Sequence, residues 1–229
     1  MKIGIVCYPT FGGSGVVATE LGLQLSKSNY EVHFVTYKQP VRLEIINSSL
    51  FFHEVNVPDY PLFHYQPYEL ALSSKLVDTV KKYNIELLHV HYAIPHAYAA
   101  YMTKQILQSE NINIPIVTTL HGTDITLVGK HPFYKPAVRF SINNSDFVTS
   151  VSEDLKKETI KLFDVEKNIK VIPNFVDFSK HMHHNKDCDR RFIARDDEKI
   201  ISHVSNFRKV KRTLDVIDIF YNIQKQVKS

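Results

Sequence analysis

The chain contains 229 residues, of which 44% are hydrophobic and 23% are charged. These shares are ordinary for a globular protein and exclude the collagen-like, disordered and coiled-coil classes. The formal net charge of +4 is too small for its sign alone to indicate a nucleic-acid or membrane surface.

Along residues 1–176, short β-branched and aromatic runs alternate with longer amphipathic stretches. This pattern is typical of an α/β fold with a parallel sheet, so we expect one Rossmann-like, doubly wound domain there. The predicted strands are Lys2–Tyr8, Glu31–Tyr37, Phe51–Val57, Glu86–Tyr92, Ile114–His121, Phe147–Val151 and Lys170–Pro173. The predicted helices are Val16–Ser28, Pro67–Tyr83, Pro95–Gln108 and Ser152–Phe163. The last of these has Ser152 as its N-cap.

Residues 177–198 are polar and lack a periodic apolar pattern, which predicts a linker. Histidines at 181, 183 and 184, with Cys188, match no zinc-binding spacing, so we interpret them as part of this linker. A strand over Lys199–Ser205 and a helix over Lys211–Gln226 are then predicted. A single β-α unit cannot bury its own apolar face, so residues 199–229 predict the start of a second Rossmann-like domain.

The two cysteines and the N-terminus bear on location. Cys7 and Cys188 form no disulfide framework, which favours a reducing compartment. The first residues lack the length and cleavage site of a signal peptide, and no window approaches the roughly 20 apolar residues of a membrane helix. We therefore expect a soluble, cytoplasmic protein.

A glycine-rich loop, Gly12–Gly15, joins the first predicted strand to the first helix. Glycines let a ligand approach the backbone, and the N–H groups at a helix N-terminus attract phosphate or carboxylate. The run Gly13–Ala18 also fits the G-x-G-x-x-A dinucleotide pattern. However, four residues separate the strand from the first glycine of that pattern, and the second strand ends in Thr36–Lys38 without an acidic residue for a ribose. An anion site and a purely structural turn remain alternatives, with NAD binding less favoured.

Two further clusters follow predicted strands. His89 and His91 lie on one face of a strand because side chains alternate with period two. They could ligate a metal, but no third ligand has a matching spacing, which favours structural histidines. The run Thr118–Asp124 offers an imidazole, hydroxyls and a carboxylate, suited to a polyol or a developing charge. A turn capped by Asp124 explains the same residues equally well.

A basic run, Asn206–Arg212, joins the predicted strand and helix of the second unit. Basic side chains beside a helix N-terminus make a good diphosphate site. A solvated basic face is the plain alternative, and a nucleic-acid patch is disfavoured because Phe207 is the sole aromatic residue beside it.

Taken in order, six motifs resemble those of the retaining GT-B glycosyltransferases of family four. They are Gly12–Gly15, His89–His91, His121–Asp124, Ser150–Glu153, Ile172–Asp177 and Asn206–Arg208 with Lys211. The resemblance implies a GT-B type α/β fold. A narrower resemblance, to the members of this family that use L-malate, rests on Tyr8–Pro9, Gly15–Leu21, His89–Ala97, Thr118–Asp124 and Ser205–Arg212. It implies a hexosyltransferase that moves N-acetylglucosamine, with retention, from UDP-N-acetylglucosamine to the hydroxyl of L-malate, the first step of bacillithiol biosynthesis. The resemblance implies transfer without a bound metal, and we expect no other cofactor.

The resemblance also implies roles for individual residues. The implied catalytic residues are His121, which would contact the transferred sugar, Arg208 and Lys211. The implied contacts of the donor diphosphate are Gly13, Ser14, Gly15, Asn206, Arg208 and Lys211. The three glycine-loop residues face either that diphosphate or an acceptor carboxylate. The candidates for binding the acceptor are Tyr92, Thr118 and Arg139.

By the same resemblance, residues 1–176 bind the acceptor, and the second domain holds most of the nucleotide sugar. The family continues well past residue 229, so we expect this chain alone to bind malate weakly and to show little transferase activity. No nucleic-acid or membrane partner is expected, and the oligomeric state is open, a homo-oligomer included. A binding-only Rossmann module for an anionic ligand and an NAD-dependent oxidoreductase are the competing interpretations.

Overall fold

The computed structural model describes residues 1–43, 48–178, 193–195, 197–205, 207 and 209–226. The chain divides into two compact units, Met1–Phe175 and Val176–Ser229. Most of the predicted linker at 177–198, including its three histidines and Cys188, lies outside the described residues. No helix in the described ranges has both the length and the apolar character needed to cross a membrane.

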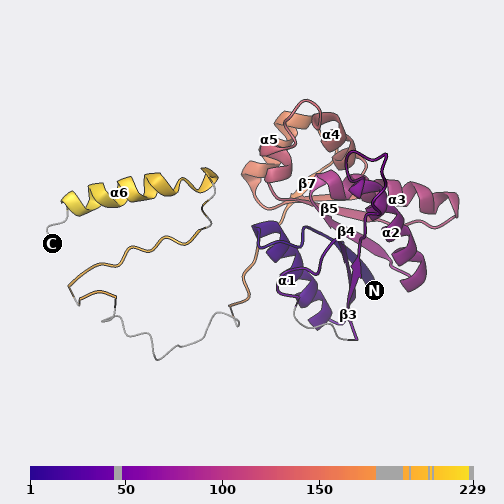
Figure 1. Cartoon of the computed structure of the whole chain (residues 1–229), viewed down its shortest axis with the longest axis horizontal. Coiled ribbons are helices and arrows are strands. Elements are labelled where there is room, and N and C mark those ends of the chain that lie inside the picture. The colour runs from indigo at the N-terminus through magenta and orange to yellow at the C-terminus, as the bar shows by residue number, and fades with distance from the viewer. Residues whose placement is uncertain (44–47, 179–192, 196, 206, 208, 227–229) are drawn as a thin grey trace. The chain divides into compact units, whose positions relative to one another are not determined.

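The first unit is built on a seven-stranded sheet in which every neighbouring pair is parallel (Figure 1). The strands are β1 (Lys2–Val6), β2 (Glu31–Thr36), β3 (Leu50–Glu54), β4 (Leu87–His91), β5 (Ile116–Leu120), β6 (Phe147–Ser150) and β7 (Ile169–Val171). Their order is β3-β2-β1-β4-β5-β6-β7, so the chain winds outward from β1 in one direction and then from β4 in the other. The predicted α/β fold with a doubly wound parallel sheet is confirmed.

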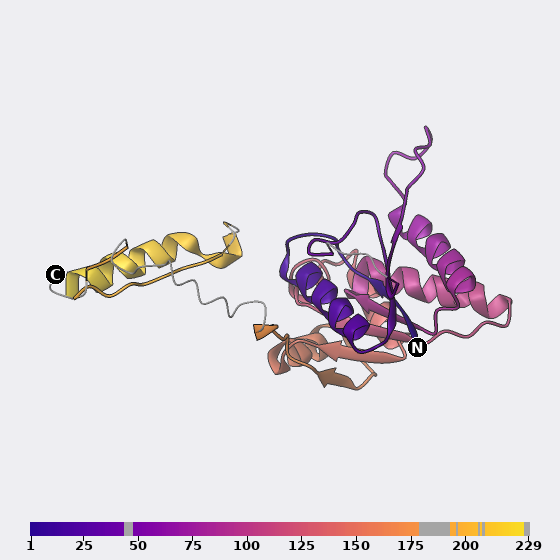
Figure 2. The same ribbon diagram turned by 90° about the horizontal axis from the view of Figure 1, so that it is seen from below.

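Helices cover both faces of this sheet (Figure 2). They are α1 (Gly13–Lys27), α2 (Tyr68–Tyr83), α3 (Tyr98–Ser109), α4 (Lys135–Asn143) and α5 (Glu153–Phe163). Alternate residues of β1 pack into two different hydrophobic clusters, one on each face of the sheet. Ile5 packs in a cluster with Ala18 of α1, while Val6 belongs to the cluster that contains Leu72 and Leu76 of α2. This alternation is why the strands are apolar on both faces.

The sequence predicted the start of α5 but missed α4. The Ser152 hydroxyl accepts a hydrogen bond from the Leu155 N–H at 3.1 Å, which confirms the N-cap of α5. Helix α4 was not predicted, although Val138 and Ile142 give it a buried face. It is only nine residues long and has Pro136 in its first turn, where proline is tolerated although it usually indicates a break.

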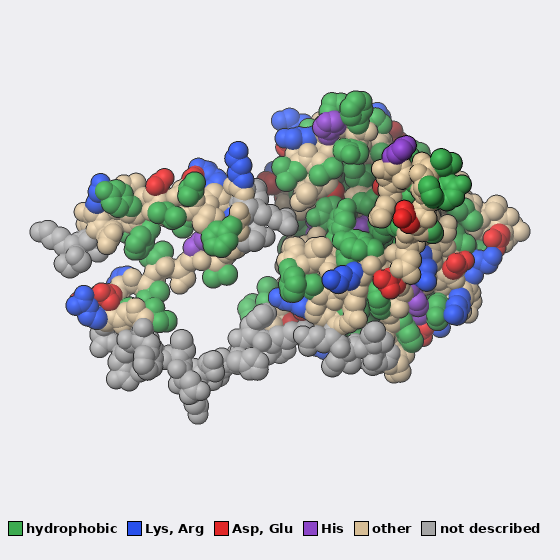
Figure 3. All heavy atoms as spheres, viewed as in Figure 1, with side chains coloured by type: hydrophobic (Ala, Val, Ile, Leu, Met, Phe, Trp, Pro, Cys, Tyr) green, Lys and Arg blue, Asp and Glu red, His purple; other side chains and the backbone are tan. Residues whose placement is uncertain are grey.

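The second unit contains α6 (Thr213–Gln226), preceded by a short helical turn at Lys209–Lys211. The helix predicted over Lys211–Gln226 is confirmed apart from its first residues. The strand predicted over Lys199–Ser205 is wrong, because the structure gives this segment no regular secondary structure. A strand needs a neighbour for its backbone hydrogen bonds, and every strand pair among the described residues belongs to the first unit. Apolar side chains are exposed along α6 (Figure 3).

Candidate active site

The candidate site lies where β1, β4 and β5 end. The chain reverses its winding between β1 and β4, and open α/β sheets bind ligands at the carboxyl ends of the strands beside such a switch point. Three predicted site residues meet there: Ser14 in the first turn of α1, Tyr92 directly after β4, and His121 directly after β5.

The glycine loop presents the beginning of α1 to this edge. A Cβ atom on Gly15 would lie 2.4 Å from the Tyr8 carbonyl oxygen and 2.5 Å from that of Thr10, so this glycine is required for packing. A Cβ atom on Gly13 would meet nothing within 4 Å. No side chain caps α1, and its first turn holds no acidic residue, so its positive end is not neutralised locally. Gly15 therefore has a structural role, and Gly13 leaves room for a ligand.

Tyr92 is the centre of the cluster. Its phenol oxygen accepts a hydrogen bond from the Ser14 hydroxyl at 3.1 Å. Its ring stacks on His121, with centroids 5.5 Å apart, and meets the ring of Tyr8 edge-on at 5.1 Å. The backbone φ of Tyr92 is 89°, a conformation that a residue with a side chain adopts at a cost of about 1–3 kcal/mol. Strain of this kind persists where surrounding contacts hold a side chain in one position.

Histidines form a second layer below the cluster. His91 Nδ1 lies 2.8 Å from His121 Nε2, and His89 stacks on His91 with centroids 4.7 Å apart, which confirms that they share one face. His96 Nδ1 donates to the His91 carbonyl oxygen at 2.6 Å. The role of His96 was missed because nothing in the spacing distinguishes it from an exposed helical residue.

Burial keeps these imidazoles neutral. It lowers the pKa of His89, His96 and His121 to about 4 each, and it lowers the pKa of His91 well below its usual value. At neutral pH they act as hydrogen-bonding groups without charge. Within the described ranges, no three His, Cys, Asp or Glu side chains are arranged to hold a metal ion.

The Asp124 carboxylate binds the backbone on which the site residues lie. Its fully buried carboxylate accepts hydrogen bonds from the N–H groups of Ala93 at 3.0 Å, Gly122 at 3.0 Å and His121 at 3.2 Å. Burial raises the pKa of Asp124 to about 6, and these hydrogen bonds oppose that rise. The capped-turn interpretation of Asp124 is confirmed, while His121 remains partly exposed beside it.

A pocket of about 650 Å³ adjoins the cluster. Its walls are mainly aromatic and apolar, with contributions from Tyr8, Tyr65, Tyr92, Tyr98 and Tyr134. The ionisable acids that line it are Glu69 and Asp124, and none of the residues lining it is Lys, Arg or His. The pocket therefore suits an uncharged group, and the donors suited to an anion lie at Ser14 and the start of α1.

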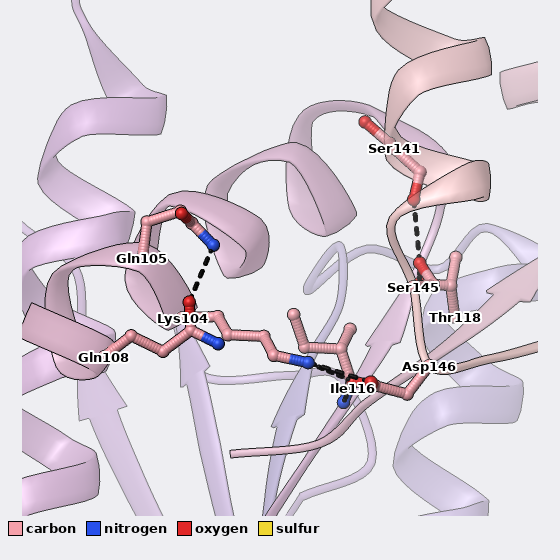
Figure 4. Close-up of polar contacts among 8 residues, drawn as sticks. All are labelled: Lys104, Gln105, Gln108, Ile116, Thr118, Ser141, Ser145 and Asp146. Atoms are coloured by element: carbon pink, nitrogen blue, oxygen red, sulfur yellow. Dashed lines mark hydrogen bonds and ion pairs between the residues drawn. The ribbon is translucent and has the colours of Figure 1, made fainter. Parts of the chain in front are cut away.

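The other two predicted acceptor residues lie elsewhere. Thr118 is fully buried, and its hydroxyl is 2.7 Å from that of Ser145 (Figure 4). Arg139 lies on α4, 3.7 Å from the Asp164 carboxylate, and lines a separate pocket. Thr118 and Arg139 do not line the pocket that Tyr92 lines, and the role of all three in binding the acceptor stays a prediction.

The predicted diphosphate residues of the second unit are only partly described. Lys211 is exposed at the end of the short turn before α6. Asn206 and Arg208 lie outside the described residues.

Comparison with known proteins agrees with this fold. Curated relatives include N-acetyl-alpha-D-glucosaminyl L-malate synthase of Bacillus anthracis, 47% identical over 99% of this chain and 59% of its own length. A putative teichuronic acid biosynthesis glycosyltransferase of Bacillus subtilis is 29% identical over 45% of this chain and 26% of its own. The chain thus spans about 59% of the length of the first of these relatives.

Solved structures show the same fold. A glycosyltransferase from Rickettsia africae is 16% identical, with a TM-score of 0.56 over 95% of this chain and 49% of its own. Sucrose-phosphate synthase from Thermosynechococcus elongatus is 16% identical, with a TM-score of 0.54 over 78% of this chain and 49% of its own. The fold class is thus that of the GT-B glycosyltransferases. Residues 11–180 match the model of Glycosyltransferase Family 4, and the chain belongs to that family.

Proposed function

We propose that this chain forms the acceptor-binding part of a retaining hexosyltransferase. The enzyme transfers N-acetylglucosamine from UDP-N-acetylglucosamine to the hydroxyl group of L-malate, as the first step of bacillithiol biosynthesis. The observation that carries the proposal is the 47% identity, over 99% of this chain, to the L-malate synthase of Bacillus anthracis.

The geometry at the start of α1 supports binding of an anion. A helix N-terminus carries roughly half a positive charge, and its free N–H groups point at the ligand. Gly13 has open space, and the Ser14 hydroxyl is fixed by its hydrogen bond to Tyr92. In our proposal, Gly13 and Ser14 contact an oxygen of the donor diphosphate or of an acceptor carboxylate.

The reaction breaks the bond between the sugar C1 and the diphosphate oxygen and forms a bond between C1 and the malate hydroxyl oxygen. Negative charge develops on the departing UDP, and the hydroxyl proton passes to an oxygen of that departing diphosphate or to water. Arg208 and Lys211, with Asn206, are proposed to stabilise that charge, since preorganised cations and donors act most strongly where charge develops. His121, held neutral by burial, is proposed to contact the transferred sugar.

The domain roles follow from the same proposal. Residues 1–176 bind the acceptor, 177–198 form the linker, and 199–229 begin the donor-binding domain. Because the chain spans 59% of the Bacillus anthracis relative, we expect it to bind malate weakly and release little UDP by itself. Four further points stay predictions: a cytoplasmic location, no cofactor, no nucleic-acid or membrane partner, and a possible homo-oligomer.

An assay of UDP release tests the proposal. The chain would be joined to the C-terminal region that the Bacillus anthracis relative has beyond the aligned part, and supplied with UDP-N-acetylglucosamine with and without L-malate. We expect UDP release that depends on malate. Binding of the sugar nucleotide without any release would favour the binding-only module and overturn the assigned chemistry.

A further inference from the structure

The contact between His91 and His121 raises a question about protons. His91 Nδ1 and His121 Nε2 lie 2.8 Å apart, a hydrogen-bond distance that requires a proton on one of the two nitrogens. A neutral imidazole carries its proton on one nitrogen and accepts at the other. Which of the two rings donates in this contact therefore decides whether the other nitrogen of His121, Nδ1, carries a proton or a lone pair.

The surroundings of His91 favour one arrangement. Its side chain is 1% exposed, and Nε2 is buried without a hydrogen-bond partner among the described residues. If Nδ1 accepted the proton from His121, the N–H at Nε2 would be a buried donor with no acceptor. If Nδ1 donates, Nε2 is only an unpaired acceptor, and orphaned buried N–H groups are the rarer of the two in proteins.

The rings around the contact hold it in place. His89 stacks on His91, and His89 Nε2 is in turn 2.8 Å from the Thr119 hydroxyl. The ring of Tyr92 stacks on His121 at an interplanar angle of 22°. The His91 carbonyl oxygen accepts from the ring of His96, which fixes the end of β4. Neither imidazole is therefore free to turn its nitrogens away from the other.

We propose that His91 is a positioning residue that donates from Nδ1 to His121 Nε2 and so holds His121 as its Nδ1–H tautomer. His121 then offers an N–H donor at the partly exposed edge of the site. With its proton already on Nδ1 and its Nε2 lone pair used by His91, His121 donates a hydrogen bond to a ligand oxygen and does not act as a general base. The identity of that oxygen as one of the transferred sugar rests on the proposed function.

The tautomer can be measured directly in this chain labelled with ¹⁵N at histidine. Long-range ¹H–¹⁵N correlation spectra at pH 7 distinguish a protonated ring nitrogen from an unprotonated one. The signals of His121 would be assigned by their loss in His121→Asn. We expect Nδ1 of His121 to be protonated. A protonated Nε2 in the wild-type chain would overturn the proposal, whatever the behaviour of any variant.

Three substitutions of His91 give the matched series. The amide N–H of His91→Asn replaces the Nδ1 donor, so we expect the Nδ1–H tautomer to persist. The carboxylate of His91→Asp accepts instead, so His121 is expected to shift to the Nε2–H tautomer. His91→Leu removes the donor and is expected to leave a mixture. His33→Asn, a buried histidine on β2 outside the site, should leave the His121 signals unchanged. Identical His121 spectra in all three His91 variants would also overturn the proposal.

Turnover supplies the functional readout. In the extended protein, His91→Leu and His91→Asp should lower kcat for UDP release by about tenfold, the upper range for one neutral hydrogen bond. His91→Asn should restore most of that loss. Absence of any UDP release would count against the proposed transferase function. The tautomer of His121 is measured without turnover, so a failure of the proposed function and a failure of the proposed role of His91 are distinguishable.

Discussion

The buried carboxylate of Asp124 accepts a hydrogen bond from the backbone N–H of Ala93 at 3.0 Å, across 31 positions of the chain. This contact joins the segment after β5 to the segment after β4, which carry His121 and Tyr92 respectively. The relative placement of these two rings thus depends on a carboxylate that accepts hydrogen bonds from the backbone of both segments.

Replacing Asp124 with Ala should lower the free energy of unfolding by about 3 kcal/mol, since it leaves the buried N–H of Ala93 and the part-buried N–H groups of His121 and Gly122 without their acceptor. Urea denaturation measures the change. Asp78→Ala, an exposed carboxylate on α2, is the matched control and should stay within about 0.5 kcal/mol of wild type. A loss no larger than that of the control would contradict the bridging role.

The glycine loop predicts a contrast between two neighbouring positions. Gly15→Ala should destabilise the fold by about 2 kcal/mol or more, because its methyl group would overlap two carbonyl oxygens. Gly13→Ala, where the added methyl meets no atom, should change the unfolding free energy by less than about 1 kcal/mol. Thermal or urea unfolding of both variants distinguishes them, and equal losses would disprove the assignment.

Protonation of the buried histidines should make the protein sensitive to acid. The pKa values of His89, His96 and His121 fall from 6.5 to about 4 on folding. A histidine whose pKa is lowered on folding makes its full contribution to the free energy of unfolding above pH 6.5. That contribution is lost as the pH falls toward 4. Each group therefore contributes a slope of about 1.4 kcal/mol per pH unit in that window.

The raised pKa of Asp124 acts in the opposite sense. Its contribution is full below pH 3.8 and is lost as the pH rises toward 6, so it offsets part of the histidine effect. Urea titrations at pH 7, 6 and 5 measure the combined effect of the histidines and Asp124 on the free energy of unfolding. The variant His96→Gln removes one titrating group from that combined effect. An unfolding free energy that stays constant from pH 7 to 5 would refute the predicted histidine dependence.

The hydrogen bond between Ser14 and Tyr92 predicts coupling between α1 and the end of β4. Ser14→Ala and Tyr92→Phe each remove one hydroxyl of the pair, which lies 3.1 Å apart. In a double-mutant cycle, we expect the second substitution to cost about 1 kcal/mol less stability when the first is already present. Strictly additive losses would indicate that this contact contributes nothing.

Local patterns predicted the framework of the first unit well. The apolar runs predicted its strands, the period of two placed His89 and His91 on one face, and Ser152 predicted the start of α5. These features depend on neighbours in the chain. The order of the strands depends on tertiary packing, and it was not predictable from the runs alone.

Features that depend on distant partners escaped prediction. Thr118 looked available for a ligand, but Ser145, 27 positions away, takes its hydroxyl. Arg139 follows β5 in the chain, but the sequence does not show that its guanidinium lies 3.7 Å from the Asp164 carboxylate. The segment 199–205 has the composition of a strand but no strand beside it among the described residues. The joining of His91 to His121, 30 positions apart, also required the register of β4 against β5.

The most direct test of the proposed chemistry is the product. The chain, extended as above, would be incubated with UDP-N-acetylglucosamine and L-malate, and the product's anomeric configuration read by ¹H NMR. We predict N-acetylglucosamine in α linkage to the malate hydroxyl oxygen, as in the donor, and a marked loss of this product in Arg208→Ala and Lys211→Ala. Free N-acetylglucosamine alone, a β-linked product, or full activity in both variants would contradict the account.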